Sequence, residues 1–323
     1  MAGVSIATVS KVVNGRSDVA PATRAVVENM IREYGYRRQR RPATRAALLD
    51  LVVHEIEGEY PIDILEGVER VAAEHRLAVV LSEARGGQTP GGGWTDGVLA
   101  RRSTGVIVVL SDLAADQRDQ LTDRSIPFVV LDPLDQPGYD VPSVGATNWS
   151  GGLAATQYLL ELGHRRIAAI TGPDGALCSR ARLDGYRAAL DTSGAPVDPE
   201  LIRHGGFQIV DGLHHATELL RLADPPTAIF ALNDATAIGV YHAAVAAGLR
   251  IPQDLSVVGF DDHPSSRWMI PPLTTVRQPL PEMGAAAARM VVDLSRGVPL
   301  SSNRLELSTE LVVRRSAAPP PCH

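Results

Sequence analysis

Short apolar runs alternate with longer amphipathic stretches along the chain from about residue 47 onward. The runs are almost continuously apolar and are bounded by Gly, Pro or Asp, which is typical of strands buried on both faces of a sheet. They are Leu48–Val53, Leu77–Leu81, Gly105–Leu110, Pro127–Leu131, Ile167–Thr171, Thr227–Leu232 and Ser256–Phe260. Helical periodicity separates them, near residues 61–75, 113–124, 148–162, 180–193, 211–222 and 234–247. This alternation predicts an α/β fold built from βαβ units, with helices on both faces of a parallel sheet.

The body of the chain is long enough for two doubly wound lobes of this kind. We place the boundary between them near Asp140–Asn148. The late part of the chain is expected to cross between the lobes, at Thr274–Gln278, in an Ala-rich helix to about Arg296 and in a strand near Arg304–Val313. Because ligands of such sheets bind beyond the carboxyl ends of the strands, the predicted site is the cleft between the lobes.

The first 36 residues carry the signals of two short helices. Ser5 can cap the first helix and Gly15 can end it, while Pro21 opens a second helix over residues 22–34. The predicted buried stripes are Val9, Val12 and Val13 in the first helix and Val26, Val27, Met30 and Ile31 in the second. The opposite face of the first helix presents small and mildly basic side chains, which suit the major groove of DNA.

Charge is distributed unevenly along the 323 residues, whose net charge is −6. Residues 1–46 hold nine basic and three acidic side chains, a net charge of +6, which leaves −12 on the remainder. A basic head on an acidic body is typical of a protein that binds a polyanion at one end. With 45% hydrophobic and 21% charged residues, the composition excludes a disordered or collagen-like chain. No apolar stretch reaches about 18 residues and we find no secretory signal, so we expect no membrane contact and a cytoplasmic location.

The remaining candidate chemistry indicates no catalytic residue, no metal and no cofactor. Cys178 and Cys322 are too few for a metal cluster or a disulfide framework, and Cys178 is expected to be a buried thiol. His214 and His215 are adjacent, so we expect them to point to different sides of a helix and to make a poor metal pair. The glycines at 91–93 lack the Lys-Ser/Thr of a phosphate-binding loop, which predicts a flexible turn.

Ordered motifs extend over nearly the whole chain. Residues 2–15 read A-G-V-S-I-A-T-V-S-K-V-V-N-G, followed by E-L-G-H-R-R-I at 161–167, R-L-D-G-Y at 182–186, N-D at 233–234, D-L-S-V-V-G-F-D-D at 254–262 and P-P-L-T-T-V at 271–276. From Ala2 to Val313 the chain resembles the lactose-repressor (LacI/GalR) family of bacterial transcription regulators. The resemblance implies a helix-turn-helix head followed by an effector domain that is similar to periplasmic binding proteins.

The resemblance also implies which residues of the head contact DNA. Ile6, Ala7 and Lys11 occupy positions that read bases, and Ser5, Thr8, Ser10 and Asn14 occupy positions that contact phosphates or brace the helix. Lys11 stands where the family more often has Arg, so discrimination at that base is expected to be softer.

Two further departures concern the ends of the head. Family members have a helix before A-G-V-S, whereas this chain starts at Met1, so we expect that helix to be missing or, as we prefer, encoded upstream. The linker lacks the family's A-R-x-L pattern, and Pro42 disfavours a hinge helix. Arg40 and Arg41 are instead expected to enter the minor groove electrostatically.

The resemblance also implies a second set of residues, which bind the effector in the cleft between the lobes. Arg182, Asn233 and Asp261 match positions that contact ligand in sugar-responsive members of the family. A sugar hydroxyl both donates and accepts hydrogen bonds. The Arg182 guanidinium donates, the Asp261 carboxylate accepts, and the Asn233 amide can do both. Phe207 and Tyr60 match aromatic positions at the ligand's apolar face, although core packing is the commoner role of a single aromatic.

These observations predict a ligand-responsive, sequence-specific DNA-binding regulator, a repressor released by a sugar-like effector and acting as a homodimer on double-stranded operator DNA. The expected domains are a DNA-binding head (1–36), a basic linker (37–46), a two-lobed effector and dimerisation domain (47–316) and a disordered tail (317–323). Two alternatives remain at this point, a periplasmic-type sugar-binding protein without DNA function and a sugar-acting α/β enzyme. The recognition helix argues against the first, and the lack of a catalytic pair argues against the second.

Overall fold

The computed structural model describes residues 46–84, 93–110, 113–136, 138 and 140–321, together with residues 12, 20, 23 and 25–27. The chain divides into two compact units, Met1–Thr44 and Arg45–His323. In the first unit Val12 and Val27 are helical and buried, as their apolar stripes predict. Val26 was expected in the same stripe, but its side chain is 47% exposed, so that part of the prediction is wrong.

The first lobe of the second unit is a six-stranded parallel sheet in the order β11-β5-β4-β3-β1-β2. Its strands are β1 (Leu48–Val53), β2 (Ala78–Glu83), β3 (Gly105–Val109), β4 (Phe128–Leu131), β5 (Ser143–Ala146) and β11 (Arg304–Leu307). Its helices are α3 (Tyr60–Glu74), α4 (Gly93–Arg101), α5 (Ala115–Asp123) and α10 (Leu280–Ser295). Alternate residues of β1 face opposite ways: Leu51 packs in the cluster with α3 and α10, and Val52 packs in the cluster with α4. Both faces of the sheet are therefore buried, as the continuous apolar runs predict.

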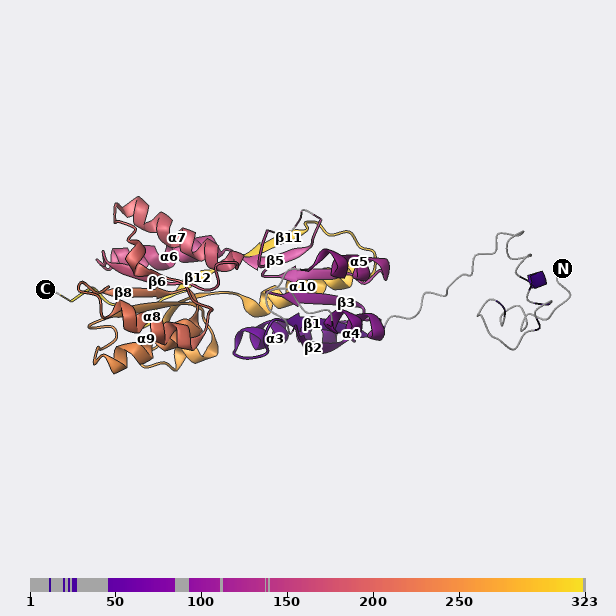
Figure 1. Cartoon of the computed structure of the whole chain (residues 1–323), viewed down its shortest axis with the longest axis horizontal. Coiled ribbons are helices and arrows are strands. Elements are labelled where there is room, and N and C mark those ends of the chain that lie inside the picture. The colour runs from indigo at the N-terminus through magenta and orange to yellow at the C-terminus, as the bar shows by residue number, and fades with distance from the viewer. Residues whose placement is uncertain are drawn as a thin grey trace. The chain divides into compact units, whose positions relative to one another are not determined.

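The second lobe repeats this plan with the order β12-β10-β9-β8-β6-β7, and only β12 is antiparallel to its neighbour. The strands are β6 (Ile167–Ile170), β7 (Ile202–Arg203), β8 (Ala228–Ala231), β9 (Ser256–Asp261), β10 (Thr274–Arg277) and β12 (Glu310–Val312). Helices α6 (Asn148–Glu161) and α7 (Leu177–Ser193) cover one face, and α8 (Ile209–Leu219) and α9 (Asp234–Ala246) cover the other (Figure 1). Phe230 and Phe260 pack under the first pair, and Ile229 and Val257 pack under the second.

Glycines bring α6 and α7 unusually close together. A Cβ on Gly152 would lie 2.2 Å from the Arg182 carbonyl oxygen, and one on Gly185 would lie 2.2 Å from the Trp149 carbonyl oxygen. Neither position can hold a larger residue without separating the helices. This contact sets the distance of Arg182 from the start of α6.

The chain crosses between the lobes three times, from β5 to α6, from β10 to α10 and from β11 to β12. In Figure 1 the orange and yellow ribbons of α10 and β11 lie among the earlier elements of the first lobe, because α10 packs on α3 and β11 pairs with β5. The predicted boundary near Asp140–Asn148 and the late crossings are confirmed. The single strand expected near Arg304–Val313 is in fact two strands, one in each lobe.

Several expectations need correction. The pattern reading missed the helix α4 and the strands β5 and β7, and Gly93 begins α4 rather than belonging to a turn. The tail was expected to be disordered over 317–323, but in residues 317–321 the backbone N–H of Ala318 donates to Ser256 Oγ (3.0 Å) and its carbonyl oxygen accepts from the Ser256 hydroxyl (3.0 Å). These bonds satisfy a buried hydroxyl at the start of β9, a need that tail composition does not reveal. Among the described residues no helix combines the length and apolarity needed to span a membrane.

Candidate functional site

The five side chains predicted to bind an effector come from both lobes. Tyr60 begins α3 in the first lobe. In the second lobe Arg182 lies in α7, Phe207 precedes α8, Asn233 caps α9, and Asp261 ends β9. Asn233 and Asp261 therefore lie at the carboxyl ends of neighbouring parallel strands, where α/β sheets bind ligands.

Arg182 is the centre of this group and is 2% exposed. Its Nε donates to Asn148 Oδ1 at 2.8 Å, and its Nη1 donates to the Leu232 carbonyl oxygen at 2.6 Å. Nη1 also lies 3.6 Å from Asp261 Oδ1, and the guanidinium carbon stands 3.8 Å from the centroid of the Phe260 ring. Its Nη2 makes no hydrogen bond to any described residue, so the fold leaves this donor unused.

Asp261 is held by residues on both sides. One carboxylate oxygen accepts from Gln278 Nε2 at 2.7 Å, and the other lies 3.3 Å from His263 Nε2. The backbone φ values of Asp261 (119°) and Asp262 (60°) are both positive, a conformation that costs energy for residues other than glycine. Asp262 accepts from Arg277 Nε at 2.8 Å and from Ser266 Oγ at 3.1 Å, so the two adjacent carboxylates have different partners.

Asn233 and Phe207 are coupled to each other. Asn233 Oδ1 accepts from the Thr236 backbone N–H at 2.9 Å, which caps α9, and Nδ2 donates to the Phe207 carbonyl oxygen at 3.0 Å. Phe207 has a positive φ of 67°, and its ring occupies the space that a Cβ on Gly172 would need. The ring centroid is 5.7 Å from the Arg182 guanidinium carbon, so Phe207 forms one wall beside the cation. The Asn233 amide oxygen and one of its N–H groups are therefore already hydrogen-bonded within the protein. A ligand would accept from its second N–H.

Tyr60 contributes through a residue that the sequence reasoning missed. Its hydroxyl donates to Asp132 Oδ2 at 2.9 Å, and Asp132 is buried directly after β4. Burial raises the pKa of the Asp132 carboxyl, and the Arg182 charge partly offsets that rise. Burial and the Asp132 charge raise the pKa of the Tyr60 hydroxyl well above 10.0, so it stays a donor. The signal was available, since an acid immediately after a predicted buried strand marks a carboxyl end of the sheet.

A second set of missed residues joins the two lobes. His263 Nδ1 lies 2.7 Å from Asp63 Oδ2 in α3, and the Ser265 backbone N–H donates to Glu59 Oε1 at 3.2 Å. Burial opposes a charge on His263, but its hydrogen bonds to Asp261 and Asp63 outweigh it and raise the pKa to about 11. Protonated His263 therefore bridges a carboxylate of the first lobe to the carboxylate beside Arg182.

A cavity of about 270 Å³ adjoins this group, lined by residues of both lobes that include Asp132, Asn148 and Cys178. None of the five predicted residues lines it, and its volume is slightly below the roughly 300–1,000 Å³ of typical ligand pockets. The expectation of a buried thiol at Cys178 is confirmed, and burial raises its pKa to about 12. We place the candidate site at the polar group around Arg182, which shares Asp132 and Asn148 with the cavity wall.

The residues predicted to contact DNA lie outside the described residues. They are Ser5, Ile6, Ala7, Thr8, Ser10, Lys11, Asn14, Arg40 and Arg41. Their roles stay predictions.

Comparison with known proteins gives matches at both ends of the chain. The family described as bacterial regulatory proteins, lacI family, matches residues 1–39, and the periplasmic binding protein-like domain matches residues 156–317. The transcriptional regulator CelR of Thermobifida fusca is 36% identical over 330 residues, which cover 98% of this chain and 96% of CelR.

Two solved structures extend the comparison. A complex of the transcriptional regulator CelR with cellobiose has a TM-score of 0.78 and 35% identity, and covers 98% of this chain and 97% of its own. The lac repressor dimer bound to operator and the anti-inducer ONPF has a TM-score of 0.74 and 28% identity, and covers 98% and 96% respectively.

Proposed function

We propose, from the premise that this chain belongs to the lacI family of bacterial regulatory proteins, that it is a repressor released from its operator by a sugar-like effector. As a member of that family it is a DNA-binding transcriptional regulator and not an enzyme. The observation that carries the proposal is the buried Arg182 beside Asp261, at the carboxyl ends of the second sheet.

The chemistry around Arg182 suits a polyhydroxylated ligand. Adjacent sugar hydroxyls need donors and acceptors side by side, and Arg182, Asp261 and Asp132 supply both within one buried group. The Phe207 ring gives the site an apolar wall, against which a sugar ring can pack. CelR, whose structure was solved with cellobiose, supports this choice of ligand class.

The contacts between the lobes supply a route from ligand to DNA. A ligand that engages Asp261 touches the carboxylate that holds His263, and His263 reaches Asp63 of the first lobe. Ser265 and Glu59 add a second link between the same segments. We infer that effector binding stabilises the closed cleft, which changes the geometry of the first lobe and moves the two heads out of register with the operator.

The protein acts as a homodimer in this proposal, so that two heads meet two operator half-sites. The second lobe exposes large apolar side chains on α8, on α9 and after β9, including Val210, Val245, Trp268 (82% exposed) and Ile270 (91% exposed). Their elements are neighbours, because α8 packs on α9 and Tyr241 of α9 donates to the Pro271 carbonyl oxygen. An apolar region of this kind is typical of a protein interface, and the lac repressor dimer supports a two-fold assembly.

The head would read the operator through Ile6, Ala7 and Lys11, with the phosphate-contacting residues named above fixing its register. We place the protein in the cytoplasm, where the operator is.

The test is a ligand screen with two readouts on the same protein. Thermal unfolding is measured with mono- and oligosaccharides, because a bound ligand raises the melting temperature in proportion to ln(1 + [L]/Kd). Each stabilising sugar is then added to the protein bound to operator DNA. The proposal expects at least one sugar to raise the melting temperature and to release DNA. A sugar that stabilises the protein but strengthens DNA binding would show that the effector is a corepressor and would contradict the proposed release. If no sugar raised the melting temperature, the proposed ligand class would be wrong.

A further inference from the structure

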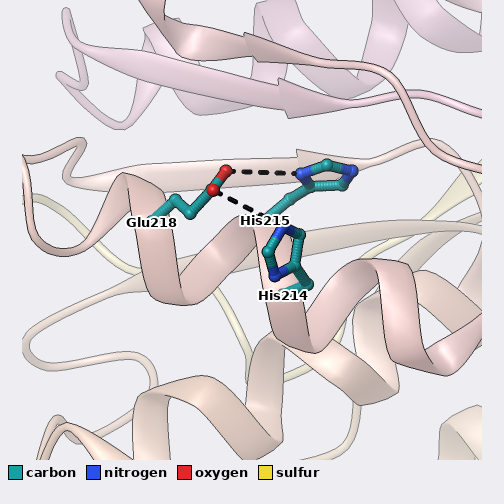
Figure 2. Close-up of side chains that lie close together, drawn as sticks. All are labelled: His214, His215 and Glu218. Carbon is teal, nitrogen blue, oxygen red and sulfur yellow. Dashed lines mark ion pairs between the residues drawn. The ribbon is translucent and has the colours of Figure 1, made fainter.

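Two histidines and a glutamate gather on α8, outside the effector site. His214 and His215 were expected to point to different sides of the helix, which would make them a poor metal pair. In the structure both rings reach the same carboxylate (Figure 2): His214 Nε2 lies 3.4 Å from Glu218 Oε1, and His215 Nδ1 lies 3.6 Å from Glu218 Oε2. The reason is helical geometry, since Glu218 is four residues after His214 and three after His215 and so neighbours both.

The distance from each imidazole nitrogen to the Glu218 carboxylate is similar to that between two ligands of one metal ion. Zn²⁺ binds imidazole nitrogen and carboxylate oxygen at about 2.0–2.2 Å, so ligand atoms around one ion are roughly 3–4 Å apart. One ligand atom from each of the three side chains can be chosen so that all lie within 4.8 Å of one another. We propose that His214, His215 and Glu218 form a binding site for a divalent transition-metal ion of the Zn²⁺ type. Two imidazoles and one carboxylate favour such an ion over Mg²⁺ or Ca²⁺, which prefer oxygen ligands.

Burial differs between the two histidines in a way that suits this role. The His214 side chain is 69% exposed and leaves the site open to solvent, whereas that of His215 is 17% exposed. His215 Nδ1 is buried and has no hydrogen-bond partner among the described residues. A buried polar atom without a partner is costly, and coordination of an ion would satisfy it.

The neighbouring cation Arg203 contacts the Glu218 carboxylate. Arg203 Nε lies 3.5 Å from Glu218 Oε2. Arg203 therefore orients the Glu218 carboxylate from outside the group of three residues. A water molecule would complete the coordination on the solvent side.

The experiment is a calorimetric titration of the untagged, chelator-treated full chain with ZnCl₂ at pH 7.5. The parent is expected to bind one Zn²⁺ per chain at this site. His214→Ala and Glu218→Gln should each weaken that binding at least about tenfold, because even the loss of an outer-shell partner weakens metal binding by about 10–100-fold. His204→Ala is the matched control, since His204 is another exposed histidine but pairs with a single carboxylate, that of Asp174. Its Zn²⁺ binding should equal that of the parent.

Protonation gives an independent readout. Both imidazoles must be neutral to bind the ion, so affinity in the parent should fall as the pH drops from 7.5 to 5.5. Circular dichroism of each variant checks that α8 and its neighbours are folded. No Zn²⁺ binding by the folded parent, or equal binding by the parent and the His214→Ala and Glu218→Gln proteins, would overturn the proposal.

Discussion

Removing the Asp63 carboxylate should weaken the effector response without touching the effector site. In the structure Asp63 Oδ2 lies 2.7 Å from His263 Nδ1 across the two lobes, while His263 keeps its second partner, Asp261. The Asp63→Ala variant therefore removes a link between the lobes and leaves the charges around Arg182 in place. Because this contact holds the two lobes together, its loss should shift the protein toward the open form.

The size of the effect follows from the chemistry of the bond. A hydrogen bond to a charged group contributes about 1.5–3 kcal/mol. The Asp63 side chain is 19% exposed, so we take the lower half of that range, about 1.5–2 kcal/mol. At about 1.4 kcal/mol for each factor of ten, effector affinity should fall about 10- to 30-fold.

The assay measures two affinities for each protein: effector by calorimetry and operator DNA by fluorescence anisotropy, with and without effector. Asp63→Ala should need about 10- to 30-fold more effector for half-release and should bind operator as tightly as the parent when effector is absent. Glu66→Ala is the matched control, because it removes an exposed carboxylate from the same helix. A half-release concentration that is unchanged in Asp63→Ala, or shifted equally in Glu66→Ala, would refute the role of this bridge.

Four further predictions concern the site, the head, the dimer and pH. Arg182→Ala should abolish effector release while operator affinity is retained, because the site loses its buried cationic donor; normal release would mean that the ligand binds elsewhere. Operator affinity should fall steeply with salt because residues 1–46 carry +6, while effector affinity should hardly change, and Lys11→Ala should cost about 1–3 kcal/mol on the operator in a binding titration. Trp268→Asp should shift sedimentation toward the monomer and weaken operator binding, and an unchanged dimer would remove the apolar surface from the interface. The pKa of His263 is raised from 6.5 to about 11, so its stabilising contribution is complete below pH 6.5 and is lost as the pH rises through 11; the stability difference between the parent and His263→Gln in chemical unfolding should therefore be smaller at pH 10 than at pH 7.

The periodicity of apolar residues along the chain was sufficient to predict most of the strands and helices. All seven apolar runs form strands, and the crossings between the lobes occur where the pattern placed them. A strand buried on both faces must be apolar at nearly every position, so its signal is local and strong. The missed elements have weak local signals: β7 has two residues, β5 reads Ser-Val-Gly-Ala, and α4 is a short helix with small residues and a buried Trp94.

In the candidate site too, some features could be predicted from the sequence and others could not. Arg182 and Asp261 stand in motifs that the sequence displays, and their closeness follows from the carboxyl ends of adjacent elements. The bridge from His263 to Asp63 joins residues 200 positions apart, and it exists because the chain packs α3 of one lobe against the segment after β9 of the other. The tail bond to Ser256 and the turn of His215 toward Glu218 likewise depend on rotamers and burial. The sequence alone therefore determined which segments are buried and which motifs carry polar groups. Only the tertiary structure decided which of these groups meet, because contacts between distant segments depend on packing that no local period encodes.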